Sequence, residues 1–100
     1  MLIKISVRHG DGISDATREK IEFKVEKLKK FYDRISLAEL TIDFVEKESP
    51  KLDLKITTEP QKEFIVTTQA ELFTALDEGL KKMEQQLKKF KEKLTDRRPE

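Results

Sequence analysis

The chain has 100 residues, no cysteine and a net charge of +1, with 36% hydrophobic and 41% charged residues. This length suits one domain with a single small core. The lack of cysteine excludes disulfides, thiolate catalysis and cysteine metal sites, and it fits a reducing compartment. No apolar run approaches the ~18 residues that a membrane span requires, and the N-terminus lacks the apolar segment of a signal peptide. We therefore expect a cytoplasmic protein with no membrane partner.

Charge is distributed unevenly along the chain. Basic residues exceed acidic ones by three over residues 1–38 and by four over 79–100, whereas acidic residues exceed basic ones by six over 39–78. Such asymmetry indicates a charged partner better than the net charge does. A solvated helix surface with paired Glu and Lys would give the same counts.

The N-terminal third predicts a strand and a helix. Residues 2–8 alternate, with Ile3, Ile5 and Val7 on one side, which is typical of a strand with one buried face. A loop with two glycines ends this strand, and Ser14 or Asp15 can cap a helix that continues to about residue 33. The apolar face of this helix consists of Ile21, Val25, Leu28 and Tyr32.

Three further strands follow in the middle of the chain. Residues 37–46 alternate, with Leu40, Ile42 and Phe44 directed inward, and residues 52–57 alternate again after a charged turn. Residues 64–68 form the fourth strand. Since Ile65 is apolar like its neighbours, the pattern leaves open which face of this strand is buried.

The longest predicted element is a helix over residues 71–94. Its apolar stripe consists of Leu72, Leu76, Leu80, Met83, Leu87, Phe90 and Leu94. Such a helix is ~36 Å long at ~1.5 Å per residue, whereas strands of about seven residues reach only ~23 Å. Its C-terminal end should therefore extend past the sheet. That end carries Lys88, Lys89, Lys91 and Lys93, with Arg97 and Arg98 beyond.

The element order βαβββα predicts an α+β domain of two layers: a four-stranded mixed sheet with both helices on one face. The first two strands should be parallel, because a helix connects them, and the last three should be antiparallel. We expect residues 1–95 to form the single domain and 96–100 to form a short basic tail.

Catalytic or metal-binding motifs are missing from the sequence. His9 is the only histidine, and Asp11 is the only carboxylate near it in the sequence, on a loop between glycines. A general base or a metal site needs more partners than this, and no phosphate-binding loop, dinucleotide fingerprint or zinc-protease helix is present. We expect no enzyme, no cofactor and no metal, and a structural or binding-surface role for His9.

Lysines recur at helical spacing beside both apolar faces. The first helix carries Lys20, Lys24, Lys27 and Lys30, and the last carries Lys82, Lys89 and Lys93 with Lys81 and Lys88 beside them. Because both helices should cover the same face of the sheet, the two rows can combine into one positive surface. Such a surface binds phosphate backbones without reading bases. Coiled-coil and membrane-surface helices show a similar pattern.

Several segments carry a family resemblance. They are Val7-Arg8-His9, Ser14-Asp15-Ala16 followed by Arg18-Glu19, Lys24-x-x-Lys27-Leu28 continuing to Tyr32-Asp33, Glu71-Leu72-Phe73-Thr74-Ala75-Leu76-Asp77, and Lys82-Met83-Glu84-x-Gln86-Leu87-Lys88-Lys89-x-Lys91. Together, over nearly the whole chain, they resemble the ribosome hibernation promoting factor family, including its ribosome-associated inhibitor relatives.

The resemblance implies a domain similar to the double-stranded-RNA-binding fold. It implies binding to the small ribosomal subunit between head and body, over the decoding region, where messenger and transfer RNA are excluded during stationary phase or stress. The partner would be ribosomal RNA, and the protein would be a monomer off the ribosome. The implied RNA-binding residues are Arg8, Lys24, Lys27, Lys30, Lys82, Gln86, Lys88, Lys89, Lys91 and Lys93.

Two alternatives remain open on the sequence. The lysine-rich helices could instead form a protein-interaction module that binds an acidic partner. In addition, the chain stops at Glu100, without the C-terminal dimerisation domain of long family members. We therefore expect either a short-form factor or the N-terminal domain of a long one, and the sequence leaves open whether it pairs ribosomes or inactivates single ones.

Overall fold

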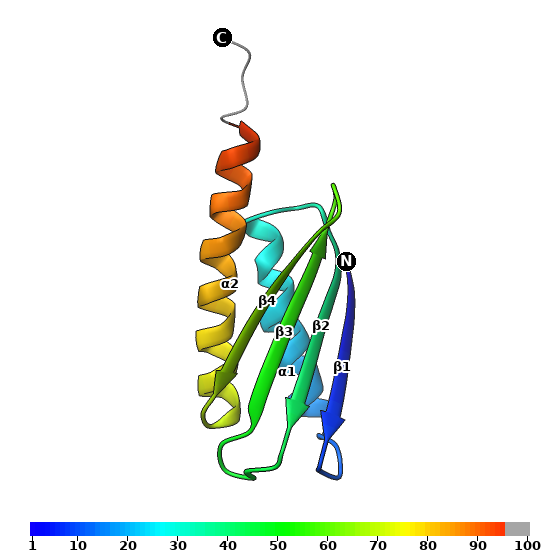
Figure 1. Ribbon diagram of the computed structural model, residues 1–100. Helices are drawn as coiled ribbons and strands as arrows, with labels where there is room; N and C mark the ends of the chain where they lie inside the picture. Colours follow the sequence, from blue (N-terminus) through cyan, green and yellow to red (C-terminus); the bar gives the residue numbers. More distant parts are fainter. Residues whose placement is uncertain (96–100) are drawn as a thin grey trace.

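The computed structural model describes residues 1–95, so the predicted tail with Arg97 and Arg98 lies outside the described residues. Seven elements follow one another: β1 (Leu2–Arg8), α1 (Asp15–Glu26), a short 3-10 helix η1 (Lys27–Lys30), β2 (Ile35–Asp43), β3 (Lys51–Thr58), β4 (Lys62–Gln69) and α2 (Leu72–Thr95). Figure 1 shows them from the side of the sheet. Their order confirms the predicted βαβββα arrangement.

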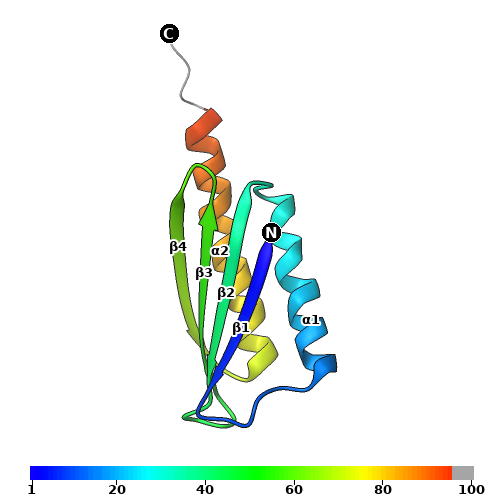
Figure 2. The ribbon, with the colours of Figure 1, turned by 90° about the vertical axis from the view of Figure 1, so that its right-hand side faces the viewer.

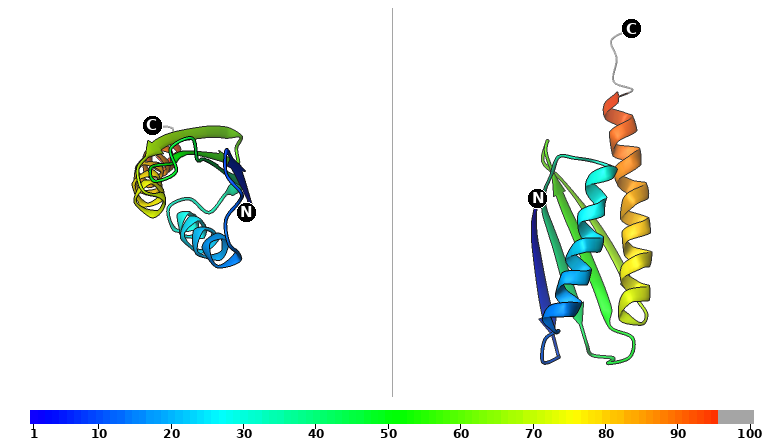
Figure 3. Two further views of the ribbon diagram at one scale, coloured as in Figure 1. Left: turned by 90° about the horizontal axis from the view of Figure 1, so that it is seen from below. Right: turned by 180° about the vertical axis from the view of Figure 1, so that it is seen from behind.

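The strands form one four-stranded sheet in the order β1-β2-β3-β4. Strand β1 pairs in parallel with β2, while the β2–β3 and β3–β4 pairs are antiparallel. Both helices lie side by side against the same face of this sheet (Figures 2 and 3). The fold class predicted from the sequence, a two-layer α+β domain with a mixed sheet, is therefore confirmed.

The core lies between the sheet and the two helices. Ile21 and Val25 of α1, Ile42 of β2, and Met83 and Leu87 of α2 are all fully buried. The two-residue alternation of the strands and the three-to-four-residue spacing of the helices direct these side chains to one interface. The stripe on α2 is thus the buried face that the sequence predicted.

Each of the two α-helices is preceded by a residue whose side chain accepts hydrogen bonds from free backbone N–H groups of the first turn. Ser14 Oγ accepts from the Thr17 N–H at 3.1 Å, which selects Ser14 rather than Asp15 as the cap of α1. Ahead of α2, the Glu71 carboxylate accepts from the Phe73 and Thr74 N–H groups at 3.1 and 3.4 Å. The acidic residue before α2 is therefore explained by capping.

Several element boundaries differ from the sequence prediction. The first helix was expected to continue to residue 33, but the α-helical part ends at Glu26 and η1 follows. Strand β2 starts at Ile35 and ends at Asp43 instead of spanning 37–46. It ends early because the Asp43 carboxylate accepts a hydrogen bond from the Val45 N–H at 3.2 Å, which turns the chain out of the sheet.

The structure shows which face of β4 is buried, a point that the sequence pattern left open. Phe64 and Val66 face the core, while the Ile65 side chain lies on the opposite face and is 61% exposed. Phe64 then forms an edge contact with Phe90 of α2, with ring centroids 5.3 Å apart, and Phe90 meets Tyr32 at the same separation. These rings hold the C-terminal half of α2, which Figure 1 shows extending past the sheet.

Candidate nucleic-acid interface

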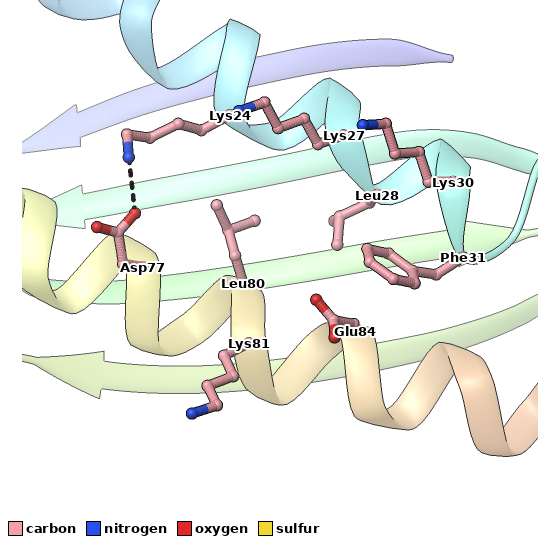
Figure 4. A pocket seen from close by; sticks show the side chains of 9 residues that line it. All are labelled: Lys24, Lys27, Leu28, Lys30, Phe31, Asp77, Leu80, Lys81 and Glu84. Atoms are coloured by element: carbon pink, nitrogen blue, oxygen red, sulfur yellow. Dashed lines mark hydrogen bonds and ion pairs between the residues drawn. The ribbon is translucent and has the colours of Figure 1, made fainter.

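A groove of about 320 Å³ separates the two helices. It is lined by Lys24, Lys27, Leu28, Lys30, Phe31, Asp77, Leu80, Lys81 and Glu84. Figure 4 shows the apolar side chains of Leu28, Phe31 and Leu80 between the helices, with Lys27 and Lys30 of η1 on one side. Lys24 reaches across from α1 to α2. The groove therefore combines an apolar lining with cationic side chains.

Carboxylates neutralise part of the charge in this groove. Lys24 Nζ lies 2.9 Å from Asp77 Oδ1, and Lys88 Nζ lies 3.3 Å from Glu84 Oε2. Lys88 Nζ also lies 5.0 Å from the centroid of the Phe31 ring, in cation–π geometry. Lys27 and Lys30 form no ion pair with any residue in the described part of the chain. Lys81, which lines the groove from α2, likewise forms no ion pair among the described residues. Lys27, Lys30 and Lys81 are thus the available cations of the groove.

A second cationic surface lies on the other side of α2. A cleft of about 180 Å³ between β4 and α2 is lined by Lys62, Phe64, Gln86, Lys89, Phe90 and Lys93. Lys82 precedes Gln86 by four residues, which places its Cβ on the same side of the helix. The two lysine rows therefore do not combine at Lys89 and Lys93, which line the cleft and are separated from the groove by α2.

The remaining predicted binding residues lie elsewhere. Arg8 is exposed at the end of β1, on the face of the sheet that the helices leave uncovered, because Ile3, Ile5 and Val7 occupy the covered face. It therefore shares neither the groove nor the cleft. Lys91 is exposed on the C-terminal half of α2.

His9 has a carboxylate partner that the sequence did not indicate. Its Nδ1–H donates to Asp43 Oδ1 at 2.8 Å, across 34 positions of the chain, so Asp11 is not the relevant neighbour. The hydrogen bond from His9 lowers the pKa of Asp43 below its ordinary value of 3.8, and the charges of His9 and Arg8 act in the same direction. The pair closes the loop after β1 onto the end of β2.

Metal sites and membrane spans are not found in the described part of the chain. No group of three or more His, Cys, Asp or Glu side chains within residues 1–95 could hold a metal ion. None of the helices over the same residues is long and apolar enough to cross a membrane. The described surface carries two clusters of lysines beside aromatic rings. This arrangement is suited to binding a polyanion.

Lys62 is a cleft residue that the sequence analysis missed. It lies at the start of β4, at least 24 positions before the other charged or amide groups of the cleft. No helical or strand periodicity connects it to them. The only sequence indication was a basic residue beside Phe64 in a turn, which is too common to be informative.

Comparisons with known proteins identify the family. The sequence profile of the family described as "Sigma 54 modulation protein / S30EA ribosomal protein" matches residues 3–95. The chain belongs to this family. Its members are ribosome-associated binding proteins rather than enzymes, so family membership confirms the prediction that the chain is not an enzyme. No curated protein matches this chain at a significant level in sequence.

Solved structures agree with this assignment. A ribosomal subunit interface protein from Coxiella burnetii superposes with a TM-score of 0.79 at 25% identity, over 91% of this chain and 98% of that one. The N-terminal domain of Thermus thermophilus Protein Y superposes with a TM-score of 0.77 at 22% identity, over 90% of this chain and 99% of that one. The second likeness shows the shared fold alone. The family resemblance read from the sequence is confirmed.

Proposed function

We propose that this family member binds the small ribosomal subunit near the decoding region and blocks translation by occluding messenger and transfer RNA, as a cytoplasmic protein that responds to stationary phase or stress. The observation that carries this proposal is the groove between α1 and α2. There Lys27 and Lys30 present ammonium groups that form no ion pair within residues 1–95, beside an apolar lining, in a chain whose family is ribosome-associated. No reaction is catalysed, so inhibition depends on occupancy alone.

Ribosomal RNA is the surface that these cations would contact. Each lysine that neutralises a phosphate releases condensed counterions, so affinity falls steeply as salt rises. Contacts of this kind position a protein without reading sequence. Residues 1–95 would form the binding domain, with 96–100 as a basic tail. The proposed contacts are Arg8, Lys24, Lys27, Lys30, Lys82, Gln86, Lys88, Lys89, Lys91 and Lys93.

Lys24 would act differently from the other groove lysines. Its ammonium group is held by Asp77 at 2.9 Å, so it contributes less free charge than Lys27 or Lys30. A phosphate at this place would have to share the ammonium group with the carboxylate or displace it. We therefore expect Lys24 to orient the two helices, and Lys27 and Lys30 to supply most of the counterion release.

Co-sedimentation with purified small subunits tests the proposal. The parent chain should pellet with empty subunits at low salt and lose binding as salt rises. Subunits already loaded with messenger and transfer RNA should bind less of it, because both ligands would occupy the same space. Equal binding to empty and loaded subunits would contradict occlusion, and no binding at low salt by the folded chain would contradict the proposal itself.

A variant carrying Lys27→Glu and Lys30→Glu tests the groove directly. It should bind small subunits more weakly and leave translation of a reporter messenger RNA in a cell-free extract largely uninhibited. Circular dichroism should match that of the parent, since both side chains are exposed. Unchanged inhibition by this variant would remove the groove from the mechanism.

The second candidate function is a protein-interaction module that binds an acidic partner. The apolar lining of the groove, with Leu28, Phe31 and Leu80, supports it, because peptide-binding grooves combine apolar pockets with charged rims. This alternative predicts binding that survives nuclease treatment of the partner. Loss of binding after nuclease treatment would reject it.

A further inference from the structure

The cleft between β4 and α2 carries more uncompensated positive charge than the helix groove. Three lysines line it, Lys62, Lys89 and Lys93, and none of the carboxylates within residues 1–95 does. The groove, by comparison, contains Asp77 and Glu84 among its lining residues. None of the three cleft lysines forms an ion pair within the described chain. An anion entering the cleft would meet ammonium groups that no carboxylate of the described residues neutralises.

Lys62 is held over the cleft by aromatic rings. Its Nζ lies 5.4 Å from the centroid of the Phe90 ring and 5.7 Å from that of the Phe64 ring. Cation–π attraction of this kind limits the freedom of a long side chain. The two rings are themselves fixed by their edge contact, 5.3 Å between centroids. One cation of the cleft is therefore positioned before any ligand arrives.

The same contacts indicate what the cleft can bind. Because the Lys62 ammonium group already lies against both rings, a nucleic-acid base cannot stack there without displacing it. A phosphate group needs no ring face and would be attracted by all three lysines at once. Gln86 adds an amide that can donate to a phosphate or a ribose hydroxyl. The arrangement thus favours a sugar-phosphate backbone over a stacked base.

We propose that the β4–α2 cleft is a second RNA-backbone site, in which Lys62, Lys89 and Lys93 contact phosphates of a ribosomal RNA segment other than the one in the helix groove. This inference rests on the proposed function, since it takes the small subunit as the partner. The groove residues fall within positions 77–84 of α2 and the cleft residues within 86–93, on opposite sides of the helix. At ~1.5 Å per residue the two sites are ~13 Å apart along the helix axis, in addition to the helix width.

A pair of charge-reversal variants measures the contribution of the cleft. Lys62→Glu with Lys93→Glu changes two cleft cations, and the matched control, Lys4→Glu with Lys47→Glu, makes the same change in net charge at exposed positions outside both sites. Binding to purified small subunits is measured across a salt series. The cleft variant should lose affinity, and the slope of log K against log salt should decrease by ~1.4 to 1.8, or ~0.7 to 0.9 per lost phosphate. The control should keep the slope of the parent.

The identity of the occupant is tested with tethered cleavage. Since the chain has no cysteine, Gln61→Cys and Phe23→Cys each create a single attachment point for an iron chelate, the first beside Lys62 and the second beside Lys27. Hydroxyl radicals from the two positions should cut two non-overlapping segments of ribosomal RNA. Cuts in the same segment from both positions would overturn the inference of a separate site. If position 23 gives RNA cuts and position 61 gives none, the occupant of the cleft is not RNA, and an acidic protein becomes the candidate.

These outcomes separate the inference from the proposed function. If the parent binds small subunits and the cleft variant binds equally well at every salt concentration, the inference fails and the proposed function stands. If the parent itself does not bind, both fail. Circular dichroism of each variant shows whether a loss of binding reflects a loss of fold.

Discussion

At the scale of single residues, His9 and Asp43 show how the loop after β1 is fixed. His9 adopts a positive φ of 55°, which glycine tolerates best among the residues and which others adopt when local contacts favour it. Its imidazole donates to Asp43, whose carboxylate also accepts from the Val45 N–H. A single carboxylate therefore connects the end of β1 to the end of β2.

His9→Gly tests this connection without straining the backbone, because glycine accepts a positive φ. Removing the imidazole should raise the pKa of Asp43 towards its ordinary value of 3.8, since the hydrogen bond from His9 is the main cause of its depression. Carbon-detected NMR titration of the Asp43 carboxyl group measures the change. An unchanged midpoint would show that the hydrogen bond does not form in solution.

The sign of the linked pH effect follows from the lowered pKa. Because the carboxylate titrates below 3.8 when folded, its stabilising contribution is present above that pH and is lost as the pH falls through the lowered pKa. Asp43→Asn should therefore flatten the acid side of the curve of unfolding free energy against pH. A curve identical to that of the parent would contradict the assignment.

At the scale of elements, periodicity predicted which elements exist, and contacts between distant residues decided where they end. The stripe on α2 and the alternation in β1 came directly from spacing and proved correct. The end of β2 coincides with the last pair of its ladder with β1, Arg8 with Asp43, and the burial of Phe64 rather than Ile65 accompanies its contact with Phe90. Such long-range contacts leave no local pattern in the sequence.

The candidate site could be predicted only in part, because helical spacing is visible in the sequence and contacts between distant residues are not. Helical spacing placed Lys27 and Lys30 beside the apolar face of the first helix, as observed. It could not show that Asp77 holds Lys24, that Lys62 joins Lys89, or that α2 divides the lysines between two surfaces. Each of these depends on how β4 and α1 pack on either side of α2.

Leu87→Ala measures how much the α2 stripe contributes to stability. Leu87 is 0% exposed in the centre of the core, so the change removes buried methyl groups and leaves a cavity. The free energy of unfolding should fall by roughly 2 to 5 kcal/mol, measured by urea denaturation. The matched control is Ile65→Ala, whose side chain is 61% exposed and which should change the free energy of unfolding by about 0.5 kcal/mol or less. A loss at Leu87 as small as that of the control would mean that Leu87 does not lie on the buried face of α2.

At the scale of the whole molecule, one long helix, α2, is buried along one side and carries lysines on both of its flanks. Met83 and Leu87 attach α2 to the sheet, and the rings of Tyr32 and Phe64 hold its C-terminal half through Phe90. The lysines on the two flanks of α2 are therefore supported by a rigid element. Changes to those lysines should affect binding far more than folding, because the buried side does not depend on them.

Lys88→Glu combined with Lys89→Glu tests this separation of binding from stability, since Lys88 faces the groove and Lys89 the cleft. Both side chains are exposed. The carboxylate introduced at position 88 would face Glu84 one turn earlier, a repulsion of about 0.2 to 0.5 kcal/mol, so thermal unfolding should change little. Affinity for small subunits should fall sharply, and the salt slope should decrease by up to two contacts, each worth ~0.7 to 0.9.

Asp53→Lys is the companion control for that measurement. It lies on the sheet face away from the helices, where Asp53 accepts a hydrogen bond from Thr67 Oγ1 at 2.6 Å. If net charge alone governed association, this variant would bind more tightly than the parent; if contacts on α2 govern it, affinity and salt slope should stay close to those of the parent. If the Lys88 and Lys89 variant binds as tightly as the parent at every salt concentration, these two lysines are not part of the interface, and contacts elsewhere, such as those of Lys27 and Lys30, must carry it.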